Sequence, residues 1–209
     1  MVPAAGSSPG RAGGELVAEA TGPGVTVVIP AHNMEAFLER ALMSAVEQTY
    51  PHLDVLVIDD GSTDGTRAIA ERIAATHGRI RVETIANAGV AAARNLGTEL
   101  ARSPYVAYLD ADDLWHPEKI EKQVAALAAH GYSEEWAGCY VLSRYIGIAD
   151  EVLANGASVT ARGDFFDKHL YRNHVGNGSC LLVRRDAALA VGGFDPAYAK
   201  RGIGGVEDY

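Results

Sequence analysis

The sequence has few cysteines and a shortage of basic residues, and each shortage excludes a class of protein. Its only cysteines, Cys139 and Cys180, lie far apart and outside any Cys-x-x-Cys arrangement. We therefore expect two reduced thiols rather than a disulfide framework or a zinc site. The 18 lysines and arginines are outnumbered by 27 aspartates and glutamates, so the net charge is −9. Because binding to a phosphate backbone needs a basic face, we expect no nucleic-acid partner.

Long apolar runs are also missing. No stretch approaches the roughly 18–20 consecutive apolar residues of a membrane-spanning helix, so no transmembrane segment is expected. Residues 1–24 are rich in Gly, Ala, Pro and Ser and lack the basic start and apolar centre of a signal peptide. We expect residues 1–24 to be a disordered leader and residues 25–209 to be one domain. We further expect a cytoplasmic location, in solution or peripheral at the inner face of the membrane.

Two hydrophobic patterns alternate regularly along the chain. Short apolar or β-branched runs, typical of buried strands, are followed by segments whose apolar residues recur every three or four positions, as in amphipathic helices. We expect strands at 25–29, 54–58, 80–85 and 105–109, and helices at 35–48, 64–76, 90–101 and 117–129. Strands that alternate with helices predict an α/β fold with a mainly parallel sheet flanked by helices.

Local signals predict where some of these elements begin and end. Pro30 is expected to end the first strand, Asn33 to cap the first helix and Asp64 to cap the second. After residue 131 the alternation stops. We then expect strands at 137–148 and 178–183, an irregular stretch at 155–177 and a short helix at 185–190.

Acidic and polar residues follow three of the predicted strands. The segments that carry them contain Pro30, Ala31, His32, Asn33 and Glu35 after the first strand, Asp59, Asp60, Gly61 and Ser62 after the second, and Asp110, Ala111, Asp112 and Asp113 after the fourth. In a parallel sheet, ligands bind beyond the carboxyl ends of the strands. Clustered carboxylates repel one another, which is costly unless a cation or a donor-rich ligand binds among them.

The segment YVAYLDADD carries the sharpest chemical signal. Its apolar strand delivers Asp110 and Asp112 two positions apart, and such oxygen ligands suit Mg²⁺ or Mn²⁺, which keep phosphates and water as further ligands. Asp60, at the end of the second strand, can accept hydrogen bonds from a nucleotide base or ribose. Arg94 can bind a phosphate, although a surface salt bridge is an alternative interpretation.

Three enzyme and signalling classes with related strand-end motifs are disfavoured. A nicotinamide-dependent dehydrogenase needs G-x-G-x-x-G after the first strand, which is absent. A dehalogenase-like phosphatase needs Thr or Val where Leu114 stands. A response-regulator receiver opens with paired acids after a strand, whereas here the first strand carries no such pair and Asp59 and Asp60 follow the second.

The strings VVIPAHNMEAFLERALMSAVEQTYPHLDVLVIDDGSTDGT, NAGVAAARNLG, YVAYLDADDLWHPEKI, NGSCLLVRRDAALAVGGFDPAY and VEDY, in this order, resemble the inverting family 2 glycosyltransferases. The resemblance covers residues 25–209. It implies a GT-A fold, which is a Rossmann-like α/β architecture, and a Mg²⁺ or Mn²⁺ cofactor. It also implies transfer from a nucleotide-diphosphate sugar, with UDP-sugar expected, to a sugar, lipid or small-molecule acceptor in cell-wall or polysaccharide biosynthesis.

The resemblance also implies roles for individual residues. Pro30, Ala31, His32, Asn33 and Glu35 match the first nucleotide-contacting loop of the family, and Asp60, Gly61 and Ser62 match the loop that recognises the base. Asp110, Ala111 and Asp112 match the metal and diphosphate motif, with Asp112 the more direct ligand. Asp208 matches the general base that deprotonates the acceptor hydroxyl, which would give inversion by direct displacement.

Two departures from the family pattern lead to further expectations. Residue 32 is His where the family often has Tyr or another aromatic, so stacking on the base is expected to be weaker or pH-dependent. The chain stops one residue after Asp208, and we expect the domain to be incomplete at its C-terminus, with donor binding but slow transfer. The alternative is a non-catalytic fragment that binds a nucleotide sugar.

Overall fold

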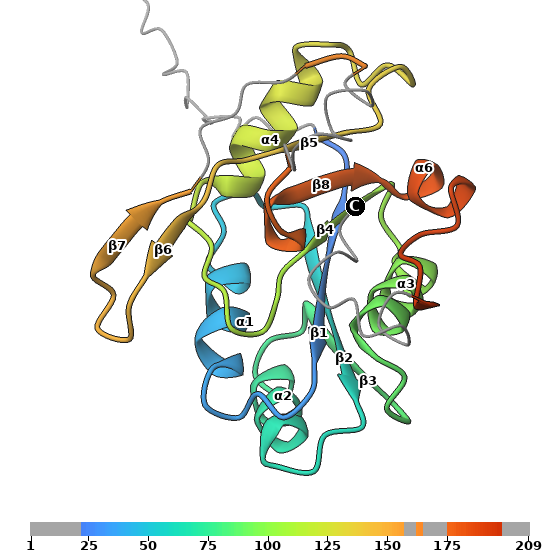
Figure 1. Ribbon diagram of the computed structural model, residues 1–209. Coiled ribbons are helices and arrows are strands. Elements are labelled where there is room, and N and C mark those ends of the chain that lie inside the picture. The colour runs from blue at the N-terminus through green and yellow to red at the C-terminus, as the bar shows by residue number, and fades with distance from the viewer. Residues whose placement is uncertain (1–21, 157–161, 165–174, 198–209) are drawn as a thin grey trace, which may run out of the picture.

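A computed structural model describes residues 22–156, 162–164 and 175–197. It contains a six-stranded sheet in the order β3-β2-β1-β4-β8-β5 and a separate two-stranded sheet of β6 and β7 (Figure 1). The strands are β1 Val25–Ala31, β2 Leu53–Asp60, β3 Ile80–Ile85, β4 Tyr105–Tyr108, β5 Gly138–Tyr140, β6 Arg144–Ile146, β7 Val152–Asn155 and β8 Leu181–Arg184. The helices are α1 Leu38–Val46, α2 Thr66–Ala74, α3 Val90–Leu100, α4 Lys119–Ala128 and α6 Arg185–Ala190.

The four strands at one side of the large sheet are parallel. β1 pairs with β2 and β4, and β2 pairs with β3, all in parallel, whereas β8 runs antiparallel to both β4 and β5. This arrangement confirms the predicted α/β fold with a mainly parallel sheet. The parallel strands therefore present their carboxyl ends along one edge, which is where the predicted site residues follow.

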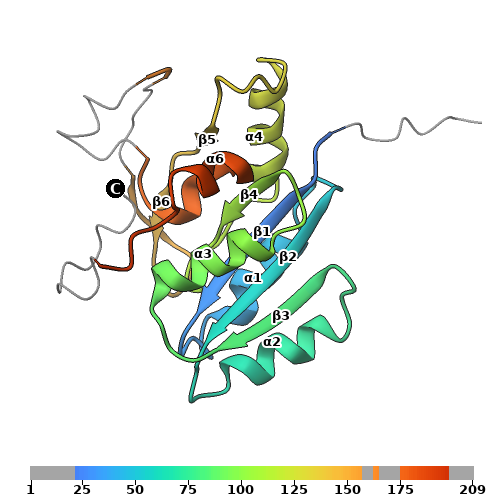
Figure 2. The ribbon, with the colours of Figure 1, turned by 90° about the vertical axis from the view of Figure 1, so that its right-hand side faces the viewer.

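Helices cover both faces of the sheet. Apolar residues of α1, α2 and α4 pack on one face, in a buried cluster that includes Leu42, Ile73 and Ile120. On the other face Ala93 of α3 packs with Val28 and other buried residues of β1, β2 and β4. Figure 2 shows α3 and α6 in front of the sheet. Because both faces are covered, β1 is buried along its whole length, in accord with its continuous β-branched composition.

The first strand continues past the residue that was expected to end it. Pro30 lies inside β1 and pairs in register with Ile58 of β2. The pairing of β1 with β4 stops at Val28 and Tyr108. Since successive residues of a strand point their backbone groups to alternate neighbours, the missing N–H of Pro30 faces the side where β4 has already ended, and no ladder bond is lost.

The prediction that Asn33 caps the first helix is wrong. α1 begins at Leu38 after a turn, and its N-cap residue is Phe37. Asn33 instead has a left-handed backbone, with φ of 54°, and its side-chain oxygen accepts the backbone N–H of Thr63 at 2.8 Å. The N-cap residue of α2 is Gly65, so Asp64 stands one residue earlier than expected of a cap, although its carboxylate accepts the backbone N–H of Thr66, the first residue of the helix, at 3.0 Å.

The chain between residues 137 and 148 was predicted as one strand and is two. Gly138–Tyr140 forms β5 of the large sheet, whereas Arg144–Ile146 forms β6 and pairs with β7. The strand predicted at 178–183 is likewise shorter, because Gly178–Cys180 forms a 3₁₀ turn before β8. Cys139 and Cys180 are free thiols, as predicted. Most of the irregular stretch 155–177 and all of 198–209 lie outside the described residues.

Candidate active site

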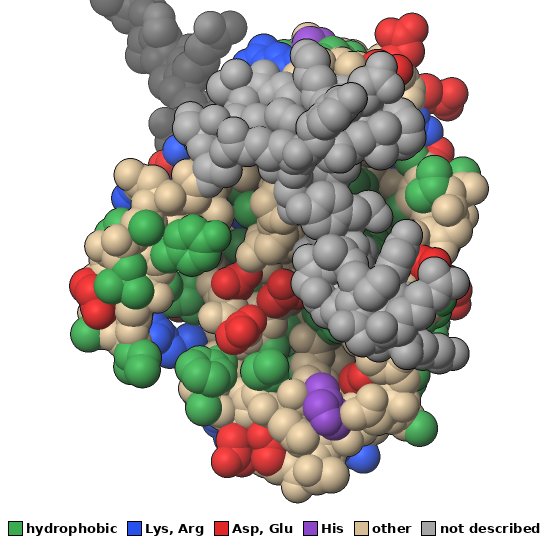
Figure 3. Space-filling view, in the orientation of Figure 1, with side chains coloured by type: hydrophobic (Ala, Val, Ile, Leu, Met, Phe, Trp, Pro, Cys, Tyr) green, Lys and Arg blue, Asp and Glu red, His purple; other side chains and the backbone are tan. Residues whose placement is uncertain are grey.

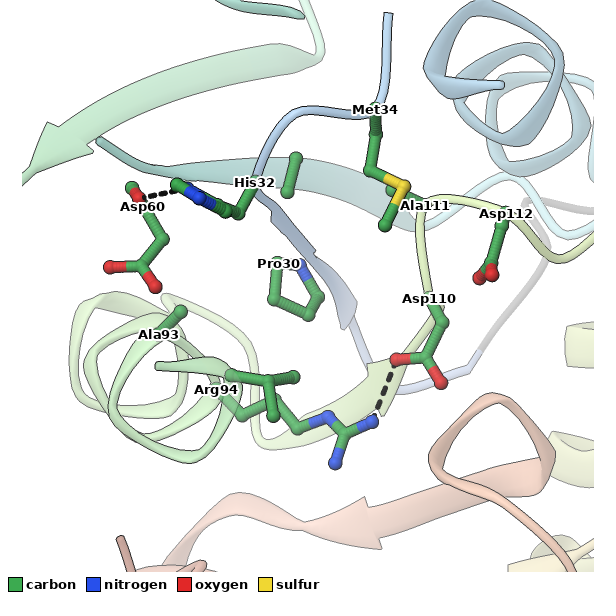
Figure 4. Close-up of a pocket in the computed structure, with 11 residues that line it drawn as sticks. Pro30, His32, Met34, Asp60, Ala93, Arg94, Asp110, Ala111 and Asp112 are labelled. Carbon is green, nitrogen blue, oxygen red and sulfur yellow. Dashed lines mark hydrogen bonds and ion pairs between the residues drawn. The ribbon is translucent and has the colours of Figure 1, made fainter. Parts of the chain in front are cut away.

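One pocket of about 210 Å³ opens at the carboxyl edge of the parallel strands. It collects residues from the ends of β1, β2 and β4 and from the first turns of α3. The predicted site residues that line it are Pro30, Ala31, His32, Asp60, Arg94, Asp110, Ala111 and Asp112. Figure 4 shows Pro30 at the centre, with Asp60 on one side and Asp110 and Asp112 on the other. The fold thus brings residues about 80 positions apart in the sequence to the carboxyl ends of the parallel strands. This is the edge at which such sheets bind ligands.

Asp60 is held in a fixed orientation at the end of β2. Its two carboxylate oxygens accept the backbone N–H groups of Ala88 and Gly89, at 2.7 and 2.8 Å. These two residues form the loop that leads into α3, and Gly89 takes φ of 91°, a conformation that favours glycine. Asp60 is only 3% exposed. The start of α3 is therefore fixed to the end of β2 through the carboxylate that lines the pocket.

His32 contacts the same strand through its ring. Its Nδ1 lies 2.7 Å from the carbonyl oxygen of Asp60. Because a carbonyl oxygen can only accept, Nδ1 carries the proton, and Nε2 is left to accept from the side-chain amide of Asn87 at 3.1 Å or of Asn33 at 3.2 Å. The imidazole is thus positioned by hydrogen bonds at the pocket wall.

Four of the predicted residues do not line the pocket. Asn33, Glu35, Gly61 and Ser62 connect the loops after β1 and β2 beside it. The N–H of Asn33 donates to Ser62 Oγ at 3.1 Å, and Glu35 Oε2 accepts the N–H of Gly65 at 2.7 Å. At Gly61, where φ is 67°, a Cβ would lie 2.8 Å from the backbone nitrogen of Asn87. Their predicted contact with a nucleotide stays a prediction.

Arg94 and Asp110 form an ion pair at the floor of the pocket. Nη2 of Arg94 lies 2.7 Å from Oδ1 of Asp110, and the two side chains are 3% and 25% exposed. The sequence left open a phosphate contact or a surface salt bridge for Arg94. The structure shows a partly buried ion pair that holds the guanidinium next to the acidic loop, at the wall of the pocket.

The acidic loop after β4 is supported by residues that the sequence did not single out. Ser179 Oγ accepts the backbone N–H of Asp110 at 2.9 Å, and the Ser179 carbonyl accepts the indole N–H of Trp115 at 2.9 Å. The side-chain amide of Asn177 donates to Asp113 at 2.9 Å. These partners come from a segment more than 60 positions away, and no local pattern marks them.

The loop concentrates negative charge. Burial raises the pKa of Asp113, and the nearby charges of Asp110 and Asp112 raise it further, against an opposing hydrogen bond from Ser179. Asp112 is exposed at the pocket edge. Figure 3 shows acidic side chains gathered near the middle of the viewed face. A cation bound there would relieve this repulsion.

The two pocket carboxylates fit a metal that takes most of its ligands from elsewhere. Within the described residues, no group of three or more His, Cys, Asp or Glu side chains could hold a metal ion. Asp110 and Asp112 supply hard oxygen ligands, as Mg²⁺ and Mn²⁺ prefer, and these ions commonly complete their coordination with phosphate oxygens and water. The donor set therefore suits a cation that arrives with a diphosphate rather than a closed structural site.

Comparison with known proteins assigns the chain to a family. Residues 26–189 match the model of glycosyl transferase family 2, and the chain belongs to this family. It is 35% identical over 165 residues to a Bacillus subtilis protein named as a teichuronic acid biosynthesis glycosyltransferase, a match that covers 78% of this chain and 62% of that protein. It is also 38% identical over 99 residues to the chondroitin synthase of Escherichia coli, covering 47% of this chain and 14% of that one.

Solved structures agree with the assignment. A mannosyltransferase from Pyrobaculum calidifontis, in complex with GDP-Man and Mn²⁺, matches with a TM-score of 0.61 and 25% identity, over 85% of this chain and 49% of that one. Residues 1–349 of S. aureus TarS, in complex with UDP-GlcNAc, match with a TM-score of 0.62 and 21% identity, over 82% and 48%. The predicted family and GT-A fold are confirmed. The chain spans about half of these solved chains and under two thirds of the Bacillus relative.

No helix in the described part of the chain is both long and apolar enough to cross a membrane.

Proposed function

We propose that this chain binds a nucleotide-diphosphate sugar, with UDP-sugar the expected donor, and transfers the sugar to an acceptor hydroxyl with inversion. The observation that carries the proposal is one pocket with Asp60 on one side and Asp110 and Asp112 on the other. This arrangement suits a donor whose nucleoside lies at the Asp60 end of the pocket and whose diphosphate lies at the end with Asp110 and Asp112. The solved relatives with GDP-Man and Mn²⁺ or with UDP-GlcNAc support it, since their folds match this one.

Different residues would bind the nucleoside and the diphosphate of the donor. Asp60, already fixed by two backbone N–H groups, keeps lone pairs for a base N–H or a ribose hydroxyl. Asp112, exposed at the pocket edge, and Asp110 would hold Mg²⁺ or Mn²⁺. When bound, such a cation neutralises the departing diphosphate. Arg94 adds a fixed positive charge beside Asp110, which favours a phosphate at that end of the pocket.

Asp208 is the proposed general base, on the strength of the family resemblance, and it lies outside the described residues. A carboxylate on the face opposite the leaving group would take the proton of the acceptor hydroxyl as the new glycosidic bond forms. Direct displacement of this kind inverts the anomeric carbon. The proposed acceptor is a hydroxyl group of a sugar, a lipid or a small molecule.

A donor panel tests the proposal. UDP-glucose, UDP-GlcNAc, UDP-glucuronate and GDP-mannose should each be incubated with the chain, Mn²⁺ and a set of saccharide and lipid acceptors, and scored for released nucleotide and for product. We expect at least one donor to be consumed, and Asp208→Asn to lower the rate by about 10²-fold or more while donor affinity is kept. An unchanged rate in Asp208→Asn would remove that residue from the base role.

The alternative function is nucleotide-sugar binding without transfer. It would show as metal-dependent binding of a donor with neither transfer nor hydrolysis by any acceptor combination. Product formation that is lost in Asp208→Asn would exclude this alternative.

A further inference from the structure

The backbone of Phe194 is hydrogen-bonded to the side chain of Asn95 in α3. The Asn95 side-chain amide donates to the carbonyl oxygen of Phe194 at 2.8 Å, and its oxygen accepts the N–H of Phe194 at 2.8 Å. Both backbone polar groups of Phe194 are therefore satisfied by Asn95, as they would be by a neighbouring strand. The arrangement defines where the Phe194 ring lies relative to α3.

The close approach of the backbone at Gly193 to the Asn95 side chain requires glycine. Gly192 and Gly193 have φ of 85° and 69°, in the left-handed region. A Cβ at Gly193 would lie 2.3 Å from the Asn95 side-chain oxygen. Any larger residue would push the segment away from Asn95 and would move the Phe194 ring with it.

The Phe194 ring packs against the ion pair of the pocket. The guanidinium carbon of Arg94 lies 5.0 Å from the centroid of the Phe194 ring, within cation–π range. On another side the ring meets Tyr108 of β4 edge to face, with centroids 5.0 Å apart. Arg94 in turn holds Asp110 at 2.7 Å. An unbroken series of contacts thus leads from Asn95 through Phe194 and Arg94 to the acidic loop.

We propose that Phe194, held by Asn95, is a positioning residue for the donor site, which acts by fixing the guanidinium of Arg94 so that Asp110 stays oriented at the pocket. The inference rests on the proposed function. Arg94 has a long side chain with several rotamers, and its aromatic neighbour restricts them before the donor binds. Because these side chains are already oriented, the protein loses less conformational freedom when the donor binds.

A purely structural role for Phe194 makes a different prediction. If the ring only filled space beside Tyr108, its replacement by leucine would lower stability, and any loss of donor affinity would be the same whichever residue stands at position 94. If the ring acts through the guanidinium, the loss must depend on Arg94. A double-mutant cycle between Phe194 and Arg94, read as nucleotide affinity, separates the two roles.

The cycle should be measured by calorimetry with UDP and with GDP, each with Mn²⁺, on the full chain. We expect Phe194→Leu to weaken binding by about five-fold, in line with a partly buried cation–π contact. Phe194→Tyr keeps the aromatic face and should stay within about two-fold of the unaltered chain. In the Arg94→Lys background, Phe194→Leu should cost less than about two-fold, because the planar guanidinium is already gone.

Tyr132→Leu is the matched control. Tyr132 is 36% exposed and packs on Tyr105, at the opposite end of β4 from Asp110, so its replacement should leave nucleotide affinity unchanged. Thermal melts of every variant report folding. An equal affinity loss from Phe194→Leu in both backgrounds would overturn the inference and leave the proposed function standing. If the unaltered chain binds neither nucleotide, the proposed function fails, and this inference fails with it.

Discussion

A buried lysine, Lys119, lies at the start of α4. Its amine lies 3.8 Å from the centre of the Trp115 ring and donates to Gln123 Oε1 at 2.9 Å. Gln123 in turn donates to the carbonyl oxygens of Cys139 and Cys180. Burial lowers the pKa of Lys119 from 10.5 to about 7, against the opposing effect of Cys180 and Cys139. Trp115 connects this group to Ser179 and hence to the acidic loop.

The lowered pKa predicts how stability changes with pH. Between pH 7 and 10.5 the unfolded chain keeps the Lys119 proton while the folded chain has released it, so the unfolded state binds more protons and stability rises with pH. Relative to Lys119→Met, the free energy of unfolding of the unaltered chain should increase through this window, by up to about 1.4 kcal/mol per pH unit. Urea melts of both proteins at pH 6.5, 8 and 9.5 measure the difference. A difference that is flat across these pH values would contradict the lowered pKa.

Among the helices, α3 carries most of the connections around the pocket. Its start is fixed to Asp60, its second turn contributes Arg94 and Asn95, and its last carbonyls, of Thr98 and Glu99, accept the guanidinium of Arg185 at the start of α6. The helix must therefore lie close to the sheet. Gly97 permits this, since a Cβ there would lie 2.2 Å from Cγ1 of Val28 in β1.

Gly97→Ala should destabilise the protein, although alanine is the better helix former. The gain in helix propensity is about 1 kcal/mol, whereas forcing a methyl group against Val28 in a packed core costs about 1–3 kcal/mol. We expect a lower midpoint in denaturant melts and weaker nucleotide binding, because Arg94 moves with the helix. The control is Gly78→Ala, where a Cβ meets nothing within 4 Å. Equal loss in both variants would show that α3 tolerates the shift.

The elements that could be predicted from the sequence are those whose signal is local. Apolar periodicity placed the first four strands and four helices to within about three residues at each end. It failed at 137–148, because an apolar run does not record that Gly138–Tyr140 pairs with β8 while Arg144–Ile146 pairs with β7. The prediction that Asn33 caps the first helix also failed. Its side-chain oxygen accepts the N–H of Thr63, a residue 30 positions away, rather than an N–H of the next helix.

At the scale of the whole molecule, the sheet accounts for most of the candidate site. Parallel strands end at one edge, so the acid at the end of β2 and the acids after β4 could be predicted to meet there. Trp115, Asn177 and Ser179 could not, since their support of the acidic loop depends on hydrogen bonds between segments 64 or more positions apart. Asp208 lies outside the described residues, and its role as general base remains a prediction.

The central claim is that Asp112 and Asp110 bind a nucleotide diphosphate through a cation. It is tested most directly by calorimetry of UDP and GDP binding in Mn²⁺ and in EDTA, with the unaltered chain, Asp112→Ala and Asp64→Ala. Asp64 is the matched control, because it accepts the N–H groups of Thr66 and Glu35 beside the pocket. Its loss should cost about 0.5–2 kcal/mol of stability and leave binding intact. We predict binding by the unaltered chain and by Asp64→Ala in Mn²⁺ only, and none by Asp112→Ala. Equal affinity in Mn²⁺ and EDTA, or equal binding by the two variants, would contradict the account.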